Sequence, residues 1–533
     1  MTRLAARLEE SRAEIEDYAR KYGLDFYDTV FETVSPREMM VVAARDGFPS
    51  RYEHWRFGME YRRMKTYFDL GQMRIYELVL NNNPSLAYML NDNDDVVNKL
   101  VIGHVYAHVD FFKNNLHFRD TNRKMIDQMA NHRRRIRQYS RSQGIDTVDD
   151  LVDNCISLNN LIDFQALVPP MTTLPPERRK KLFKGEGEEE TAQPPEPAKG
   201  AEGDEYMAWW LREMVPEHER ALAAEEPAKR PIRDVMLFLI EHAPLKDWEA
   251  SVLSMMRDET YYFRPQRQTK IMNEGWATYW HSKIMRGEGI SLWEQEGRPA
   301  LDVPLLPPYL DFKDTDLYAR VNAGVLATSP SQLNPYKLGV ELYKDIEERW
   351  NLGLFGREYE ECEDMEKKLG WDTGLNGGRD YIYFVRELYN DWGFLNRFLT
   401  KDFCRKQKMF IYDYNPMSGW YEISDRDWLM VKERLLNQFT NAGEPIIEIT
   451  DDNYKNRREL YLKHEHPGPE EFDLKLDHAL DTLIALQKLW RRPVHIETIV
   501  QGQKMRFSHD GTKPWMEELE PKRRNNRNVP DWL

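Results

Sequence analysis

The chain has 533 residues, of which 41% are hydrophobic and 12% aromatic, so it has ample apolar material for two or three packed domains. Its formal net charge of -15 argues against general binding to nucleic acids and against adsorption to anionic membrane surfaces. Its three cysteines, Cys155, Cys362 and Cys404, are widely separated and odd in number, which favours a reducing compartment over a disulfide framework. We therefore expect a cytoplasmic protein.

Residues 1–174 read as the first half of a mostly helical domain. Residues 1–23 have a charged amphipathic pattern with Leu4, Leu8 and Ile15 at apolar positions, and they lack the apolar core and cleavage site of a signal peptide. No uninterrupted apolar run approaches the length needed to span a membrane. We expect no insertion into a membrane.

Two histidines one helical turn apart interrupt the apolar run from Leu100 to Phe118. His104 and His108, at positions i and i+4, would share one face of a helix, where two neutral imidazoles offer nitrogen ligands side by side. Taken alone, such a pair is more often a set of hydrogen-bonded core or surface groups than a metal site. The prediction of a metal site therefore needs further candidate ligands from a second stretch of the sequence.

Residues 175–205 are rich in proline, glycine and acidic side chains. A segment of this composition cannot bury enough apolar surface to offset its ordering entropy, so we expect a disordered insertion. Helical patterning resumes afterwards, and residues 206–400 read as the second half of the helical domain.

One carboxylate interrupts an apolar stripe in this second half. Glu259 follows Trp248 and Val252 on one helical face. A carboxylate in such a stripe is usually either paired with a cationic side chain or engaged in chemistry, and nearby arginines leave the paired interpretation open. Glu259 is therefore a candidate acid or base.

The stretch from Lys270 to Met285 supplies the second signal for a metal. Glu274, Thr278 and His281 are spaced by four and then three residues, so the three side chains share one helical face. Glu274 lies among apolar residues, where its charge is costly to bury without a cation or hydrogen-bond donors. His104, His108 and Glu274 together suit a divalent metal, and zinc is the ion that we expect.

Past residue 400 the pattern changes to short strands that alternate with helices. Residues 401–533 contain two successive units of two strands and a helix, followed by two further strands. We expect a small α+β domain with an internal pseudo-repeat, in which helices cover one face of a sheet. The predicted fold is thus a mostly α-helical main domain with a C-terminal α+β domain.

Four long motifs invite a family assignment. In chain order they read RYEHWRFG, LNNNPSLAYML, HVYAHVDFFKNN and KIMNEGWATYWH, and they resemble the stage V sporulation protein R (SpoVR) family over most of the chain. The resemblance implies a cytoplasmic bacterial protein linked to formation of the spore cortex. In species that do not form spores, it implies a gene neighbourhood with a serine kinase and a von Willebrand-like protein, which are the candidate protein partners. It implies no settled biochemical activity.

A looser likeness is to zinc peptidases of the thermolysin type. His104, His108 and the Asn273-Glu274 pair match the outline of their ligands, but those enzymes place a catalytic glutamate directly after the first histidine, where this chain has Val105. A hydrolytic base must then come from elsewhere, and Tyr106 and His281 are candidate donors to a developing oxyanion. The polar candidates for the base are Glu259, Glu53, His54 and Asp110.

Two functions of different class follow from these patterns. One is a metal-dependent hydrolase or transferase that acts on an amide-containing substrate such as a peptidoglycan precursor. The other is a non-catalytic assembly or signalling factor that binds a protein partner through its C-terminal domain. The missing glutamate at Val105 favours the second, and the polar groups set among aromatic side chains favour the first.

Overall fold

The computed structural model describes residues 2–4, 6–70, 77–163, 231–286, 333–466 and 473–519. These residues divide into two compact units. Unit 1 contains the described residues up to Arg135 and those from Arg264 to Ala442, and unit 2 contains the remainder. Each unit is described by itself.

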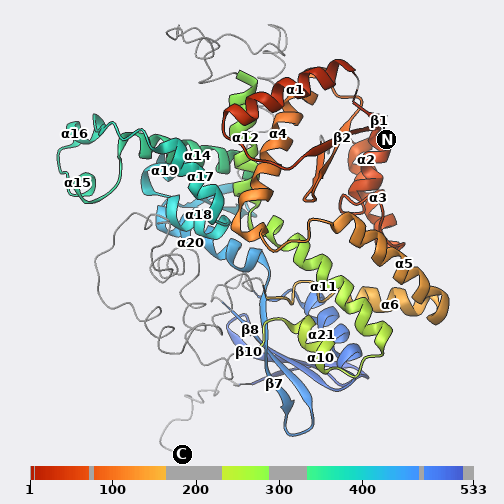
Figure 1. Ribbon diagram of the computed structural model, residues 1–533. Coiled ribbons are helices and arrows are strands. Elements are labelled where there is room, and N and C mark those ends of the chain that lie inside the picture. Colours follow the sequence, from red (N-terminus) through yellow and green to blue (C-terminus); the bar gives the residue numbers. More distant parts are fainter. Residues whose placement is uncertain are drawn as a thin grey trace, which may run out of the picture. The chain divides into compact units, whose positions relative to one another are not determined.

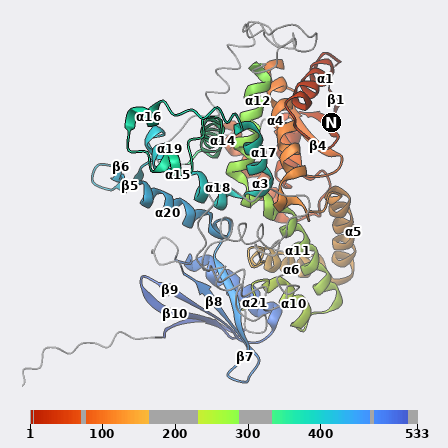
Figure 2. The same cartoon turned by 60° about the vertical axis from the view of Figure 1, so that its left-hand side comes forward.

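The centre of unit 1 is α4 (Asp95–Asn114), which is buried along almost its whole length. A helix that is buried on every side has to be enclosed by other elements. The helices α1 (Ala6–Lys21), α12 (Lys270–Arg286) and α17 (Gly378–Leu388) all contact it, and α14 (Pro335–Leu352) packs on α12. Figures 1 and 2 both show α4, in orange, alongside α12, in green.

A four-stranded sheet lies beside α4 in unit 1, and the sequence patterns did not predict it. Its strand order is β1-β2-β4-β3, with β2 and β4 parallel and β3 antiparallel to β4. Because β3 is an edge strand that contacts α4, it brings its first residue, Glu77, toward that helix. The strands are β1 (Thr2–Arg3), β2 (Thr29–Val34), β3 (Glu77–Leu80) and β4 (Ser85–Leu90).

The other elements of unit 1 are further helices and one two-stranded hairpin. They are α2 (Pro36–Ala43), α3 (Trp55–Asp69), η1 (Leu116–Phe118), the first part of α5 (Met125–Gln143), α15 (Arg357–Glu360), α16 (Met365–Leu369), α18 (Asp391–Phe398), α19 (Lys401–Lys406), β5 (Ile411–Asn415), β6 (Trp420–Asp425), α20 (Trp428–Phe439) and η5 (Thr440–Gly443), whose last residue belongs to unit 2.

Unit 2 is built on a five-stranded sheet of order β11-β10-β9-β8-β7. Helix α21 packs against β9 and β10, and the β9 residues Val494 and Ile496 are buried. The strands are β7 (Ile446–Tyr454), β8 (Glu459–Glu465), β9 (Val494–Val500), β10 (Gln503–His509) and β11 (Pro514–Glu518), and the helices are α6 (Ile145–Ile156), α10 (Val235–His242), most of α11 (Asp247–Gln268) and α21 (Leu476–Trp490).

The predicted fold class is confirmed: the main part of the chain is dominated by helices, and the C-terminal part combines helices with a sheet. Residues 401–442 belong to unit 1, and residues 136–163 and 231–263 belong to unit 2 with the C-terminal sheet, while the predicted domain ranges stay a prediction. The strands β5 and β6 form a hairpin separate from the five-stranded sheet, and the internal pseudo-repeat stays a prediction.

The predicted disordered insertion at residues 175–205 and the residues that follow it up to 230 lie outside the described residues. Among the residues that are described, no helix combines the length and apolar character that crossing a membrane requires.

Candidate metal centre

The two histidines predicted to bind a metal lie on the buried face that α4 turns toward α12. His104 and His108 are each only 4% exposed, and their ring centroids are 4.5 Å apart. The spacing of four residues places the two rings on one side of the helix, as expected from the sequence, with an interplanar angle of 89°. Two imidazoles therefore face the same buried space.

Glu274 reaches this space from α12 and is also buried. Its Oε2 atom lies 3.5 Å from His104 Nε2 and 3.5 Å from His108 Nε2. These separations are too long for good hydrogen bonds. They do match the spacing of about 3.3–3.5 Å that two ligand atoms adopt around a tetrahedral metal ion at about 2.0–2.1 Å from each. The structure thus brings together the three predicted metal ligands.

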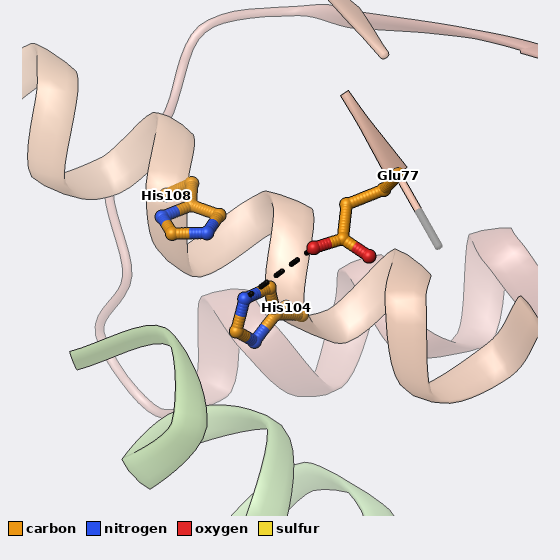
Figure 3. A group of neighbouring side chains, drawn as sticks. All are labelled: Glu77, His104 and His108. Atoms are coloured by element: carbon orange, nitrogen blue, oxygen red, sulfur yellow. Dashed lines mark ion pairs between the residues drawn. The ribbon is translucent and has the colours of Figure 1, made fainter. Parts of the chain in front are cut away.

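A second carboxylate, which the sequence patterns did not single out, joins the histidines from the sheet. The Oε1 atom of Glu77 lies 3.8 Å from His104 Nε2, and Figure 3 shows its side chain pointing from β3 toward the two rings on α4. One ligand atom from each of Glu77, His104 and His108 lies within 4.8 Å of the other two. Glu77 had no local signal, because a short strand gives no indication of the helix that it will face.

The outer nitrogen of each histidine is held by a partner on α12. His104 Nδ1 lies 2.9 Å from His281 Nδ1, and His108 Nδ1 lies 2.8 Å from Asn273 Oδ1. These contacts leave the Nε2 atoms facing Glu274. His281 is thus beside the metal ligands, as its helical spacing suggested, and it contacts His104 through its own Nδ1.

The charges at the centre favour an anionic Glu274. Burial alone would raise the pKa of Glu274, but Lys270, His104 and His108 together hold it well below its ordinary value. Burial lowers the pKa of His108, yet its contacts with Glu274 and Asn273 outweigh this effect and raise the pKa. Glu274 is therefore a carboxylate, and its Oε1 atom pairs with Lys270.

Two buried atoms at the centre lack the partner that burial normally demands. His104 Nε2 and Glu274 Oε2 are both inaccessible and have no hydrogen-bond partner among the described residues. Unpaired buried polar atoms cost about 1–3 kcal/mol each, so such atoms generally indicate a missing partner. A divalent cation between the two atoms fits this donor set of neutral imidazole nitrogens and carboxylate oxygens.

Tyr336 on α14 and Lys270 on α12 complete the surroundings and were not predicted. The Tyr336 ring stacks near His104, with centroids 6.3 Å apart and an interplanar angle of 23°. Burial and the charges of Glu274 and Glu77 raise the pKa of the Tyr336 phenol, so it stays protonated and can donate a hydrogen bond. The phenol is a donor next to an otherwise acceptor-rich centre.

Two other candidates on α4 have different partners. The hydroxyl of Tyr106 lies 2.8 Å from Arg12 Nη1 and 3.2 Å from Glu16 Oε2, which are on α1. Asp110 accepts hydrogen bonds of 2.8 Å from the Asp25 backbone and from Trp276 Nε1, and burial raises its pKa to about 6. Both side chains are bonded within the helical packing, and a catalytic role for Tyr106 stays a prediction.

The remaining candidates for a base lie on other elements. Glu53 is about half exposed and pairs with Arg133, and His54 caps α3 by accepting from the backbone of Arg56. Glu259 is 4% exposed on the part of α11 that belongs to unit 2. Its role therefore also stays a prediction.

Comparisons with known proteins agree with the motifs. A family model described as SpoVR like protein matches residues 3–444. The uncharacterized protein YcgB of Escherichia coli (strain K12) is 27% identical over 474 residues, which cover 85% of this chain and 84% of that protein. No solved structure matches the chain. The chain therefore belongs to the SpoVR-like protein family.

Proposed function

We propose that this protein is a metal-dependent hydrolase or transferase that acts on an amide-containing substrate, and that His104, His108 and Glu274 hold its metal. The observation that carries the proposal is the position of Glu274 Oε2, 3.5 Å from the Nε2 atoms of both histidines. Glu77 is a further carboxylate at the same place.

Zinc suits a donor set of imidazole and carboxylate without sulfur, although other divalent ions accept the same ligands. When bound, such an ion supplies a Lewis acid that polarises a carbonyl group. The chain's own residues contribute orientation and charge. Lys270 keeps Glu274 anionic. Glu77, with 19% of its side chain exposed, is the most accessible of the four grouped side chains. Tyr336 offers a hydrogen bond to an oxygen that gains charge.

The substrate class that we propose is a cytoplasmic peptidoglycan precursor, with a role in forming the spore cortex in spore-forming relatives. Support comes from membership of the SpoVR-like family and from the resemblance of the motifs to that family. A precursor contains both acetamido groups and peptide bonds, so one polarised carbonyl serves either a hydrolytic or a transfer reaction.

The test is metal analysis followed by a hydrolysis assay. Protein purified without chelators should contain about one divalent ion per chain, and His104→Ala, His108→Ala and Glu274→Gln should each lower that content. His242→Ala, at a histidine whose side chain is 54% exposed in unit 2, is the control and should leave the content unchanged. A muramyl-peptide precursor incubated with the loaded protein should lose an acyl or peptide group by mass spectrometry. Metal-free wild-type protein would contradict the proposal.

The alternative function is a non-catalytic factor that binds a protein partner, and one feature favours it. The β5–β6 hairpin exposes large apolar side chains, with Trp420 at 73%, Met417 at 97% and Tyr414 at 55%. Exposed apolar groups of this size commonly mark contact surfaces. The serine kinase and the von Willebrand-like protein implied by the family resemblance are the partners to test. Trp420→Ser should weaken their co-purification with the chain if this function holds, whereas Glu274→Gln should not.

A further inference from the structure

The two ring nitrogens of His104 have the same kinds of neighbour as the two ring nitrogens of His108. In both His104 and His108, Nδ1 contacts a side chain of α12 at 2.8–2.9 Å, while Nε2 faces Glu274. The contacts link residues 177 and 165 positions apart in the chain. A histidine whose outer nitrogen is engaged cannot rotate its ring without breaking that bond. Each partner on α12 therefore controls the orientation of one imidazole.

We infer that His281 and Asn273 are positioning residues that hold the two ligand imidazoles in their metal-binding tautomer. The inference rests on the proposed metal centre. A nitrogen that binds a metal carries no proton, so the ring proton of a neutral ligand histidine is on its other nitrogen. His104 and His108 then both donate from Nδ1. His281 accepts at its Nδ1 and keeps its own proton on Nε2, and Asn273 accepts at its carbonyl oxygen.

The chemical character of these acceptors sets this centre apart from many others. Ligand histidines commonly donate to a carboxylate or to a backbone carbonyl, and a carboxylate makes the ligand more basic. Here the side chains that contact the Nδ1 atoms are a second imidazole and an amide, and neither is a carboxylate. Among the described residues, the carboxylates that approach the two histidines are Glu274 and Glu77, and a cation bound there keeps more of its Lewis acidity than one whose ligand histidines donate to carboxylates. This arrangement suits an ion that has to polarise a substrate oxygen.

The positioning role of His281 replaces the oxyanion-donor role that its sequence spacing suggested. From its spacing alone it was a candidate donor to an oxyanion, but its Nδ1 is engaged with His104 and the residue is 1% exposed. It acts through His104 and does not itself contact substrate. Asn273, 9% exposed, holds His108 in the same way.

The first test measures zinc affinity by competition with a chromophoric chelator. His281→Phe and Asn273→Leu remove an acceptor while they keep bulk, and each should weaken zinc binding by about 10–100-fold. His281→Gln and Asn273→Asp restore an acceptor and should remain within a few-fold of wild type. Thr278→Val is the matched control, since Thr278 is buried on the same helix between the two positioning residues and has no hydrogen-bond partner among the described residues for its Oγ1. It should bind zinc like wild type.

The second test detects the ring protons of the two histidines directly by proton NMR. Cobalt-loaded wild-type protein in water should show two strongly shifted, solvent-exchangeable proton resonances, one from each Nδ1–H. His281→Phe should lose or exchange-broaden one of them and Asn273→Leu the other, while Thr278→Val should keep both. A purely structural role would change stability without selecting one resonance.

The outcomes separate the two proposals. If wild-type protein binds no metal, the proposed metal centre itself fails, and this inference with it. If wild-type protein binds zinc but His281→Phe and Asn273→Leu bind it equally well, only the positioning role is overturned. Should His281→Phe fail to fold, the comparison of Asn273→Leu with Asn273→Asp tests the same role on the other histidine.

Discussion

Gly275 on α12 faces Gly339 on α14 so closely that a Cβ atom on Gly275 would lie 2.5 Å from the Cα of Gly339. No side chain fits at this crossing, so both positions require glycine for close approach of two backbones. The crossing is adjacent to Glu274 in the chain and brings Tyr336, three residues before Gly339, near His104. The packing of α12 on α14 thus shapes the metal centre.

Gly339→Ala should therefore lower stability and metal affinity together. Its added methyl group would overlap the backbone oxygen of Ile271, and an overpacked core typically costs about 1–3 kcal/mol. Chemical unfolding and a zinc competition assay measure the two effects. Gly58→Ala is the control, because that helical glycine in α3 has open space around its Cβ position and should gain or keep stability. A fully stable Gly339→Ala protein would show that α14 can shift without cost.

Glu77→Gln should weaken zinc binding by about tenfold or more while leaving the fold intact. The carboxylate contributes negative charge 3.8 Å from His104 Nε2, and glutamine removes that charge while it nearly conserves the shape of the side chain. Isothermal titration with zinc measures the change. The matched control is Glu32→Gln, a carboxylate on β2 of the same sheet that is not part of the metal cluster. Equal affinity in both variants would remove Glu77 from the centre.

Glu259→Gln tests the candidate acid or base predicted from the sequence. If Glu259 takes part in chemistry, the variant should keep its fold and its metal and yet fail to restore cortex formation in a spore-forming host that lacks the protein. Glutamine nearly conserves the shape of this buried side chain, so the loss would be chemical. Asp258→Asn, at the exposed neighbouring position, should complement normally. Full complementation by folded, metal-loaded Glu259→Gln protein would exclude the catalytic role.

His117 should make the protein less stable as the pH falls. Burial, together with the nearby Arg264, lowers the pKa of His117 to about 3, below its ordinary value of 6.5. Between these two values the unfolded chain binds a proton that the folded protein does not, so the stability contributed at neutral pH is lost as the pH decreases.

Replacing this histidine by an apolar residue removes that contribution. His117→Leu should show a smaller loss of stability than wild type when urea unfolding is compared at about pH 7.5 and about pH 5. His242→Leu, at the exposed histidine of α10, should behave like wild type. Parallel pH profiles for wild type and His117→Leu would indicate that His117 is not the group responsible.

Helical periodicity alone was enough to predict that His104 and His108 share one helical face and that Glu274, Thr278 and His281 share a face of a second helix. These are local properties, because residues four apart in a helix have a fixed geometry. The motifs likewise identified the SpoVR-like family, and the change of pattern after residue 400 predicted the C-terminal sheet and helices.

Only the tertiary structure decided how these helices meet. The packing of α12 on α4 brings Glu274 to both Nε2 atoms and assigns Asn273 and His281 to the two Nδ1 atoms, across separations of 165 and 177 residues. An edge strand adds Glu77, for which the sequence had no signal, and Glu259 falls in the other compact unit. Contacts between distant segments depend on how whole surfaces fit together, and this fit is not contained in the spacing of residues along one helix.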